Sequence, residues 1–105
     1  MGPKTRELIA VLEELAAVLK RDGNIPWSSL IHRAKSRLEN DDYSGIGSLL
    51  SAYGGMGSIN DLVLGQSVEA GEFSWKAGHF DLNEKFLALK NRAWEIAYEI
   101  KRAQE

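Results

Sequence analysis

Cysteine is absent from this sequence of 105 residues, and proline, methionine and histidine occur only twice each. The absence of cysteine excludes disulfide bonds and thiolate metal sites, and it fits a reducing compartment. Two histidines without a third ligand at a telling spacing do not indicate a metal site. We therefore predict a cytoplasmic protein with no metal and no cofactor.

The sequence also lacks a block of one charge and a long apolar run. Its 13 basic and 15 acidic residues are interspersed and leave a net charge of −2, so nucleic acid is not expected as a partner. No segment approaches the roughly 20 apolar residues that cross a bilayer. Glu13 and Glu14 interrupt the first apolar stretch, which argues against a secretory signal and against a membrane partner.

What the sequence does contain is apolar residues at helical spacing. Its length is that of one domain, which we place at residues 1–105. We predict an all-α fold, a compact bundle of four main helices with a short helical turn, a glycine-rich corner and a long aromatic loop. The main helices are expected at about residues 5–21, 26–39, 44–53 and 82–102.

The glycine-rich corner is the part that helix packing does not explain. Eight of the ten glycines lie between Gly45 and Gly78, and three of them, Gly54, Gly55 and Gly57, form this corner, which continues into Ser58, Asn60 and Asp61. Ser58 is placed to cap the short helical turn, with Asp61 as the reciprocal acid. Backbone amides at such a point can bind an anion. The simpler interpretation is a tight connection between helices.

Residues 66–80 carry apolar side chains among glycines and polar residues, which predicts a long irregular loop pinned by its aromatic residues, with a little strand character as the alternative. His79 and Asp81 form a His-x-Asp pair that suits acid–base chemistry. Asp81 is also expected to be the N-cap of the last helix.

The last helix has two apolar stripes, and the second consists of Leu87, Trp94 and Tyr98. A helix that is apolar on two sides is central or is covered by another molecule. We expect the aromatic loop of the same chain to cover this stripe. A homodimer interface is the alternative.

The run from Leu49 to Leu64 resembles the signature of a family of small bacterial domains of unknown function, which carries a YGGMGSxNDLVL-type motif. That resemblance implies a helical N-terminal half, a loop containing Trp75 and a closing helix. It implies no activity and no catalytic residues.

Taken together, these features favour a non-enzymatic protein that recognises a protein partner through the corner and the aromatic loop. One alternative is a small enzyme, or a binder of a small molecule or anion, that uses His79, Asp61 and Asp81. Another is a structural homodimer. The candidate binding residues are Tyr53, Gly54, Gly55, Gly57, Ser58, Asn60, Asp61, Trp75 and His79.

Overall fold

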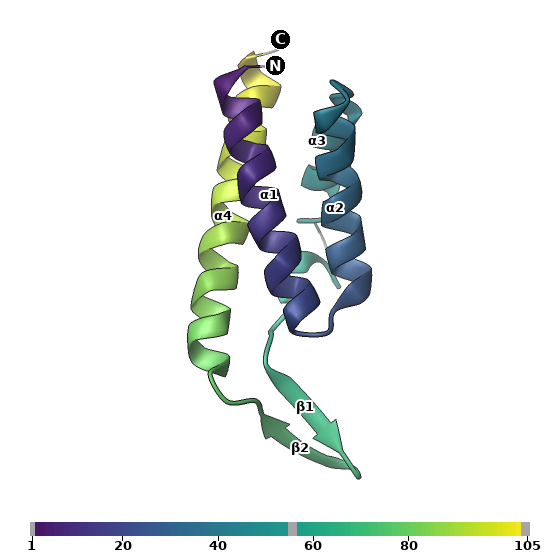
Figure 1. The fold of residues 1–105 in the computed structure, drawn as a ribbon, viewed down its shortest axis with the longest axis vertical. Coiled ribbons are helices and arrows are strands. Elements are labelled where there is room, and N and C mark those ends of the chain that lie inside the picture. The colour runs from purple at the N-terminus through teal and green to yellow at the C-terminus, as the bar shows by residue number, and fades with distance from the viewer. Residues whose placement is uncertain (1, 55–56, 104–105) are drawn as a thin grey trace.

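The computed structural model describes residues 2–54 and 57–103, and the chain extends over 50 × 24 × 20 Å. Gly55, one of the predicted binding residues, lies outside the described residues. Helices dominate the described part, and both termini lie at one end of the long axis (Figure 1). The elements are α1 (Pro3–Arg21), α2 (Ile25–Glu39), α3 (Ser44–Ser51), the 3₁₀ turn η1 (Ile59–Asp61), β1 (Gln66–Glu69), β2 (Glu72–Trp75) and α4 (His79–Ala103).

The first two helices follow directly from their sequences. Gly23 ends α1 with a φ of +87°, a conformation that glycine adopts without strain. The side chain of Asn24 then caps α2 by accepting a hydrogen bond from the Trp27 amide at 3.4 Å. The leucines of the α1 stripe are fully buried: Leu8, Leu12, Leu15 and Leu19.

The four helices pack around one hydrophobic core. Helix α1 packs against α2 and α4, and α3 also packs against α2 and α4. Gly45 permits the close approach of α3 to α2, because a Cβ atom there would lie 2.8 Å from the carbonyl oxygen of Ala34. Ile59 from η1 and Leu64 complete the core beside the helices.

The prediction of an all-α fold is wrong, because residues 66–75 form an antiparallel hairpin instead of an irregular loop. Ala70 and Gly71 connect the strands with φ values of +52° and +80°, as a type I′ turn requires. Asparagine or aspartate normally precedes the glycine of such a turn, so the alanine hides the hairpin in the sequence. The hairpin extends beyond the helices at the end opposite the termini (Figure 1).

Helix α4 begins at His79, three residues earlier than expected. The Leu82 amide donates to the carbonyl of Gly78 at 3.0 Å, so Asp81 lies inside the first turn and is not the N-cap. An acidic side chain in this turn still interacts favourably with the positive end of the helix dipole.

Candidate functional site

The hairpin has one apolar face and one polar face. Val68 pairs with Phe73, and Gln66 pairs with Trp75, in the register of the two strands. Directly paired residues share a face of the sheet, and so do residues two apart along a strand. Val68, Phe73 and Trp75 therefore lie on one face, whereas the opposite face carries Ser67, Ser74, Glu69 and Glu72.

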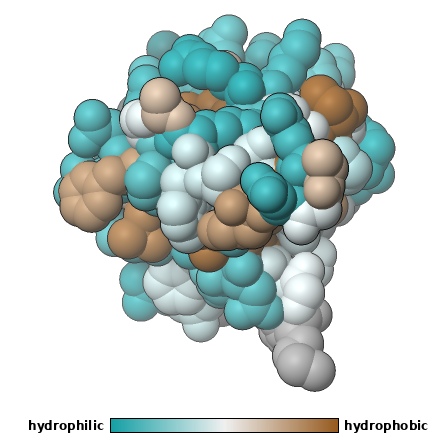
Figure 2. All heavy atoms as spheres, turned by 90° about the horizontal axis from the view of Figure 1, so that it is seen from below, coloured by the Kyte–Doolittle hydropathy of each residue, from teal (hydrophilic) through white to brown (hydrophobic). Residues whose placement is uncertain are grey.

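The apolar face of the hairpin is open to solvent. The exposed fractions are 69% for Val68, 55% for Phe73 and 47% for Trp75. Within the described residues, the strands make their extensive contacts only with each other. Figure 2 looks at this end of the molecule and shows hydrophobic residues at the surface between hydrophilic ones. An amphipathic hairpin would normally turn this face to a core.

Stacked rings join the hairpin to α4. The Phe73 ring meets the Trp75 ring edge-on, with 5.2 Å between centroids, and Trp75 stacks on His79 at 4.8 Å. The Nδ1 atom of His79 lies 3.1 Å from the carbonyl oxygen of Lys76. Two predicted binding residues, Trp75 and His79, are thus in contact, and their stack joins the base of the hairpin to the first turn of α4.

Asp22, at the end of α1, fixes the base of the hairpin. Its carboxylate accepts a hydrogen bond from the Gly65 amide at 2.9 Å and forms an ion pair with Nζ of Lys76 at 3.3 Å. The Lys76 ammonium also donates to the Asp22 carbonyl at 2.9 Å. The Lys76 amide closes the base by donating to the Gly65 carbonyl at 2.7 Å. No pattern around Asp22 indicates this role, because Asp22 lies 43 residues from its backbone partner Gly65.

Asn83 of α4 holds the residue that precedes this base. Its side-chain oxygen accepts from the buried Leu64 amide at 2.8 Å, and its side-chain nitrogen donates to the Leu64 carbonyl at 2.7 Å. The same nitrogen donates to the His79 carbonyl at 2.9 Å. Both backbone groups of Leu64 are satisfied by one side chain, so the position of the hairpin base is defined.

The polar groups of the glycine-rich corner mostly satisfy one another. The Asn60 side chain donates to the Tyr53 carbonyl at 2.8 Å, and Asp61 accepts from the Gly57 amide at 2.8 Å. Ser58 caps η1 by accepting from the Asn60 amide at 3.3 Å. Asp61 thus reaches back to Gly57, one residue before the cap. Gly54, Gly57, Asn60 and Asp61 are nevertheless exposed.

Tyr53 and Lys90 connect this corner to α4. The Tyr53 hydroxyl donates to the Lys90 carbonyl at 2.6 Å, and burial raises the pKa of the phenol. The Lys90 side chain is buried, with its ammonium 5.5 Å from the centroid of the Phe86 ring. Burial lowers the pKa of Lys90, and the Asp61 carboxylate partly opposes that shift. Sequence reasoning missed Lys90 because its position on the helix gives no sign of a neighbouring loop.

The second stripe of α4 is uncovered, contrary to the expectation that the aromatic loop covers it. Leu87, Trp94 and Tyr98 are 50%, 42% and 39% exposed. The hairpin into which that loop folds extends away from the helices and leaves the stripe open. Beside the stripe is a depression of about 450 Å³ that is lined by Tyr53, Asn60, Asn91, Trp94 and Glu95.

The residues of the enzyme alternative do not assemble into a cluster. His79 stacks on Trp75, whereas Asp61 lies at the corner near Lys90. In residues 2–54 and 57–103, no three histidine, aspartate or glutamate side chains lie close enough to hold a metal ion.

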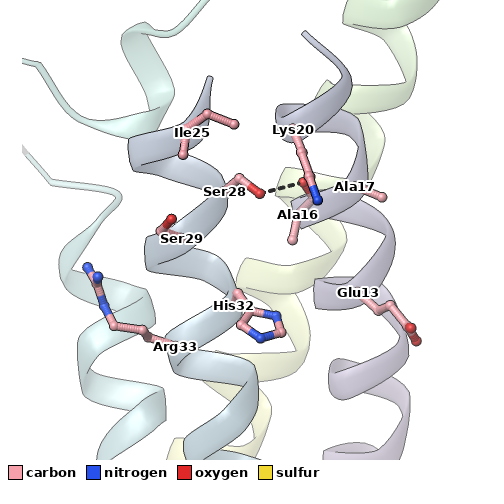
Figure 3. Close-up of a pocket in the computed structure, with 9 residues that line it drawn as sticks. All are labelled: Glu13, Ala16, Ala17, Lys20, Ile25, Ser28, Ser29, His32 and Arg33. Carbon is pink, nitrogen blue, oxygen red and sulfur yellow. Dashed lines mark hydrogen bonds between the residues drawn. The ribbon is translucent and has the colours of Figure 1, made fainter. Parts of the chain in front are cut away.

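A groove of about 620 Å³ between α1 and α2 was not anticipated (Figure 3). The His32 ring points toward α1 in this groove. The Ser28 hydroxyl donates a hydrogen bond to the Ala16 carbonyl at 2.8 Å. That hydroxyl therefore serves the contact between the two helices. The groove offers an open surface and no converging set of polar groups.

The fold and the surface together define a helical scaffold that carries a projecting, amphipathic hairpin. The chain belongs to the family described as a domain of unknown function, DUF6966, whose model matches residues 20–76. The matched range includes α2, α3, the corner and the whole hairpin. Comparison with curated proteins and with solved structures found no match. Of the helices in the described part, none is both long and apolar enough to cross a membrane.

Proposed function

We propose that the protein is a binding module that engages a protein partner through the apolar face of its hairpin. The observation that carries the proposal is that Val68, Phe73 and Trp75 share one face of the hairpin and are all exposed. Exposed apolar patches commonly mark interaction sites, and aromatic side chains are enriched where binding energy concentrates. An isolated two-stranded hairpin is marginally stable in water, so contact with a partner also stabilises this one.

Two glutamates beside the turn of the hairpin favour a partner that carries basic residues. Glu69 and Glu72 are paired directly across the two strands, where like charges are unfavourable. The partner that fits this surface has an apolar pocket for the apolar face of the hairpin and basic residues at the edge of that pocket. Those basic residues relieve the repulsion between the two glutamates. The free outer edges of both strands supply further backbone donors and acceptors for such a partner.

This proposal retains Trp75 and His79 from the predicted site and gives the glycine-rich corner a supporting role. Tyr53, Asn60 and Asp61 already hydrogen-bond within the chain, so they offer fewer unsatisfied groups to a partner. The hairpin presents apolar area whose burial contributes roughly 25 cal/mol per Å².

The experiment compares Val68→Ser and Phe73→Ser with a matched control, Val63→Ser. Val63 is 47% exposed and lies outside the hairpin. A partner captured from the native host is identified by mass spectrometry and purified, and its dissociation constant is measured with each variant. We expect each hairpin variant to weaken binding at least about tenfold and the control to have little effect. Equal affinities for all three variants would refute the assignment.

A further inference from the structure

The exposed face of α4 has the spacing of a helix–helix seam. Leu87, Asn91, Trp94 and Tyr98 follow one another at intervals of four, three and four residues, and all are exposed. This is the a/d pattern by which two helices pack along their length. The opposite side of α4 is already occupied, because Phe86, Ala93, Ile96, Ala97 and Ile100 belong to the core.

The seam is also ordered in advance. The Trp94 and Tyr98 rings stack with 5.1 Å between centroids, and the Arg102 guanidinium lies 5.3 Å from the centroid of the Tyr98 ring. Side chains that are already held in one arrangement lose less conformational entropy when a partner covers them.

We propose that a second copy of this chain covers the seam, with the two α4 helices antiparallel and related by a two-fold axis. A two-fold axis between positions 92 and 93 brings Leu87 opposite Tyr98 and Asn91 opposite Trp94. The same register brings Glu84 opposite Lys101. One register thus places Leu87 against the Tyr98 ring, the Asn91 amide against Trp94 and Glu84 against Lys101, and each pair occurs twice about the axis, as a self-complementary interface requires.

The charge distribution selects this orientation. The first turn of α4 contains Asp81, followed by Glu84 and Lys85, and its last turn contains Lys101 and Arg102. Glu99, which precedes them, already forms an ion pair with Lys4. Within the described residues, Glu84 and Lys101 form no ion pair in their own chain. A parallel arrangement would place like charges together at both ends, whereas the antiparallel one pairs opposite charges and opposes the helix dipoles.

The depression beside the seam provides a pocket for Trp94 of the second copy. It is lined by Asn91, Glu95 and the chain's own Trp94 on α4, together with Tyr53 and Asn60 of the corner. In the proposed register, Trp94 of the second copy faces Asn91 and enters this depression. The Asn91 amide oxygen and the Glu95 carboxylate are acceptors for its indole N–H, which needs a partner when it is buried.

Sedimentation equilibrium from micromolar to millimolar protein tests the proposal. We expect the wild type to dimerise, and Leu87→Glu and Trp94→Ser each to raise the dimer dissociation constant at least about thirtyfold. Val68→Ser on the hairpin is the matched control and should leave dimerisation unchanged. Circular dichroism checks that the variants retain their helices, as expected for exposed positions.

Cross-linking tests the orientation, because the chain has no cysteine of its own. Under mild oxidation, an equimolar mixture of Glu84→Cys and Lys101→Cys should give disulfide-linked dimers, whereas each variant alone should give few. A monomer at every concentration, loss of the dimer in Val68→Ser, or efficient self-linking of Glu84→Cys would overturn the proposal. Failure here leaves the hairpin experiment unaffected, since that experiment concerns a different surface and partner.

Discussion

At Gly65 the backbone of the hairpin base lies directly against His79 of α4. Its φ is +83°, and a Cβ atom added there would lie 2.5 Å from Cβ of His79. Its amide is held by Asp22 and its carbonyl by the Lys76 amide. The position therefore requires glycine both for its backbone conformation and for the space around it.

Gly65→Ala should lower the free energy of unfolding by about 3 kcal/mol, because left-handed strain and overpacking add together. Gly71→Ala is the matched control, since Gly71 has a φ of +80° with open space around it. We expect the control to cost only about 1 kcal/mol, from the backbone conformation. Urea denaturation of both variants measures the difference. Equal costs would show that His79 moves aside freely.

Lys90 makes stability depend on pH in the alkaline range. Burial lowers its pKa in the folded protein, so the unfolded chain binds more protons between the folded value and the ordinary one. Stability therefore rises as pH increases through that interval. Lys90→Met removes the buried charge and should raise the free energy of unfolding at pH 7 by about 1 kcal/mol.

Urea denaturation from about pH 7 to 9.5 tests whether stability rises with pH. The range ends at about 9.5 because tyrosine begins to ionise in the unfolded chain above it. The stabilities of the wild type and of Lys90→Met should converge as pH rises. Lys85→Met is a matched control on an exposed position of the same helix. A constant difference between wild type and Lys90→Met would show that the protonation of Lys90 does not contribute.

At the scale of elements, the hairpin is joined to the helices by a few polar contacts at its base. Asp22→Ala removes the acceptor for the Gly65 amide and the anionic partner of Lys76. We expect exchange of the hairpin amides to accelerate at least about tenfold, while the amides in the middle of α1 and α4 change less. Hydrogen exchange followed by NMR measures both. Asp81→Ala, near the same end of the molecule, is the control and should have little effect. Equal acceleration of all amides in Asp22→Ala would mean that Asp22 supports the whole fold.

The elements differ in how far they can be predicted from sequence, and the reason is physical. Helices such as α1 repeat a buried stripe over many turns, so their period is detectable. Each strand of the hairpin has four residues, and neither strand packs on the core. The alternation is too short to establish a period, and Ala70 replaces the usual residue of a type I′ turn. The aromatic residues of this segment were identified, but their shared face depends on the pairing register.

At the scale of the whole molecule, the candidate sites arise from contacts between residues that are distant in sequence. Tyr53 and Lys90 are 37 residues apart, and Leu64 and Asn83 are 19 apart. Composition and periodicity do not determine such pairs, because each member suits many surroundings. The second apolar stripe of α4 was predicted from its spacing, but the expectation that the aromatic loop covers it was wrong, because exposure depends on the direction in which the hairpin leaves the helices.

Excision of the hairpin tests whether recognition and folding are carried by different parts of the molecule. The Lys76 amide donates to the Gly65 carbonyl at 2.7 Å, so an Asn-Gly turn can replace residues 66–75 without moving the base. We expect the free energy of unfolding to change by about 1 kcal/mol, mainly through loss of the Trp75–His79 stack. Urea denaturation should still show one cooperative transition.

The excised variant should also lose the protein partner of the hairpin, whereas dimerisation through α4 should persist. Ala70→Asn is the control, because it relieves the positive φ of the turn and keeps the whole hairpin. Binding by titration and stability by denaturation are measured on the same samples. If excision unfolds the helices, the hairpin is part of the folding unit. In that case the contribution of the hairpin to the stability of the fold has to explain its exposed face, before any role in recognising a partner is considered.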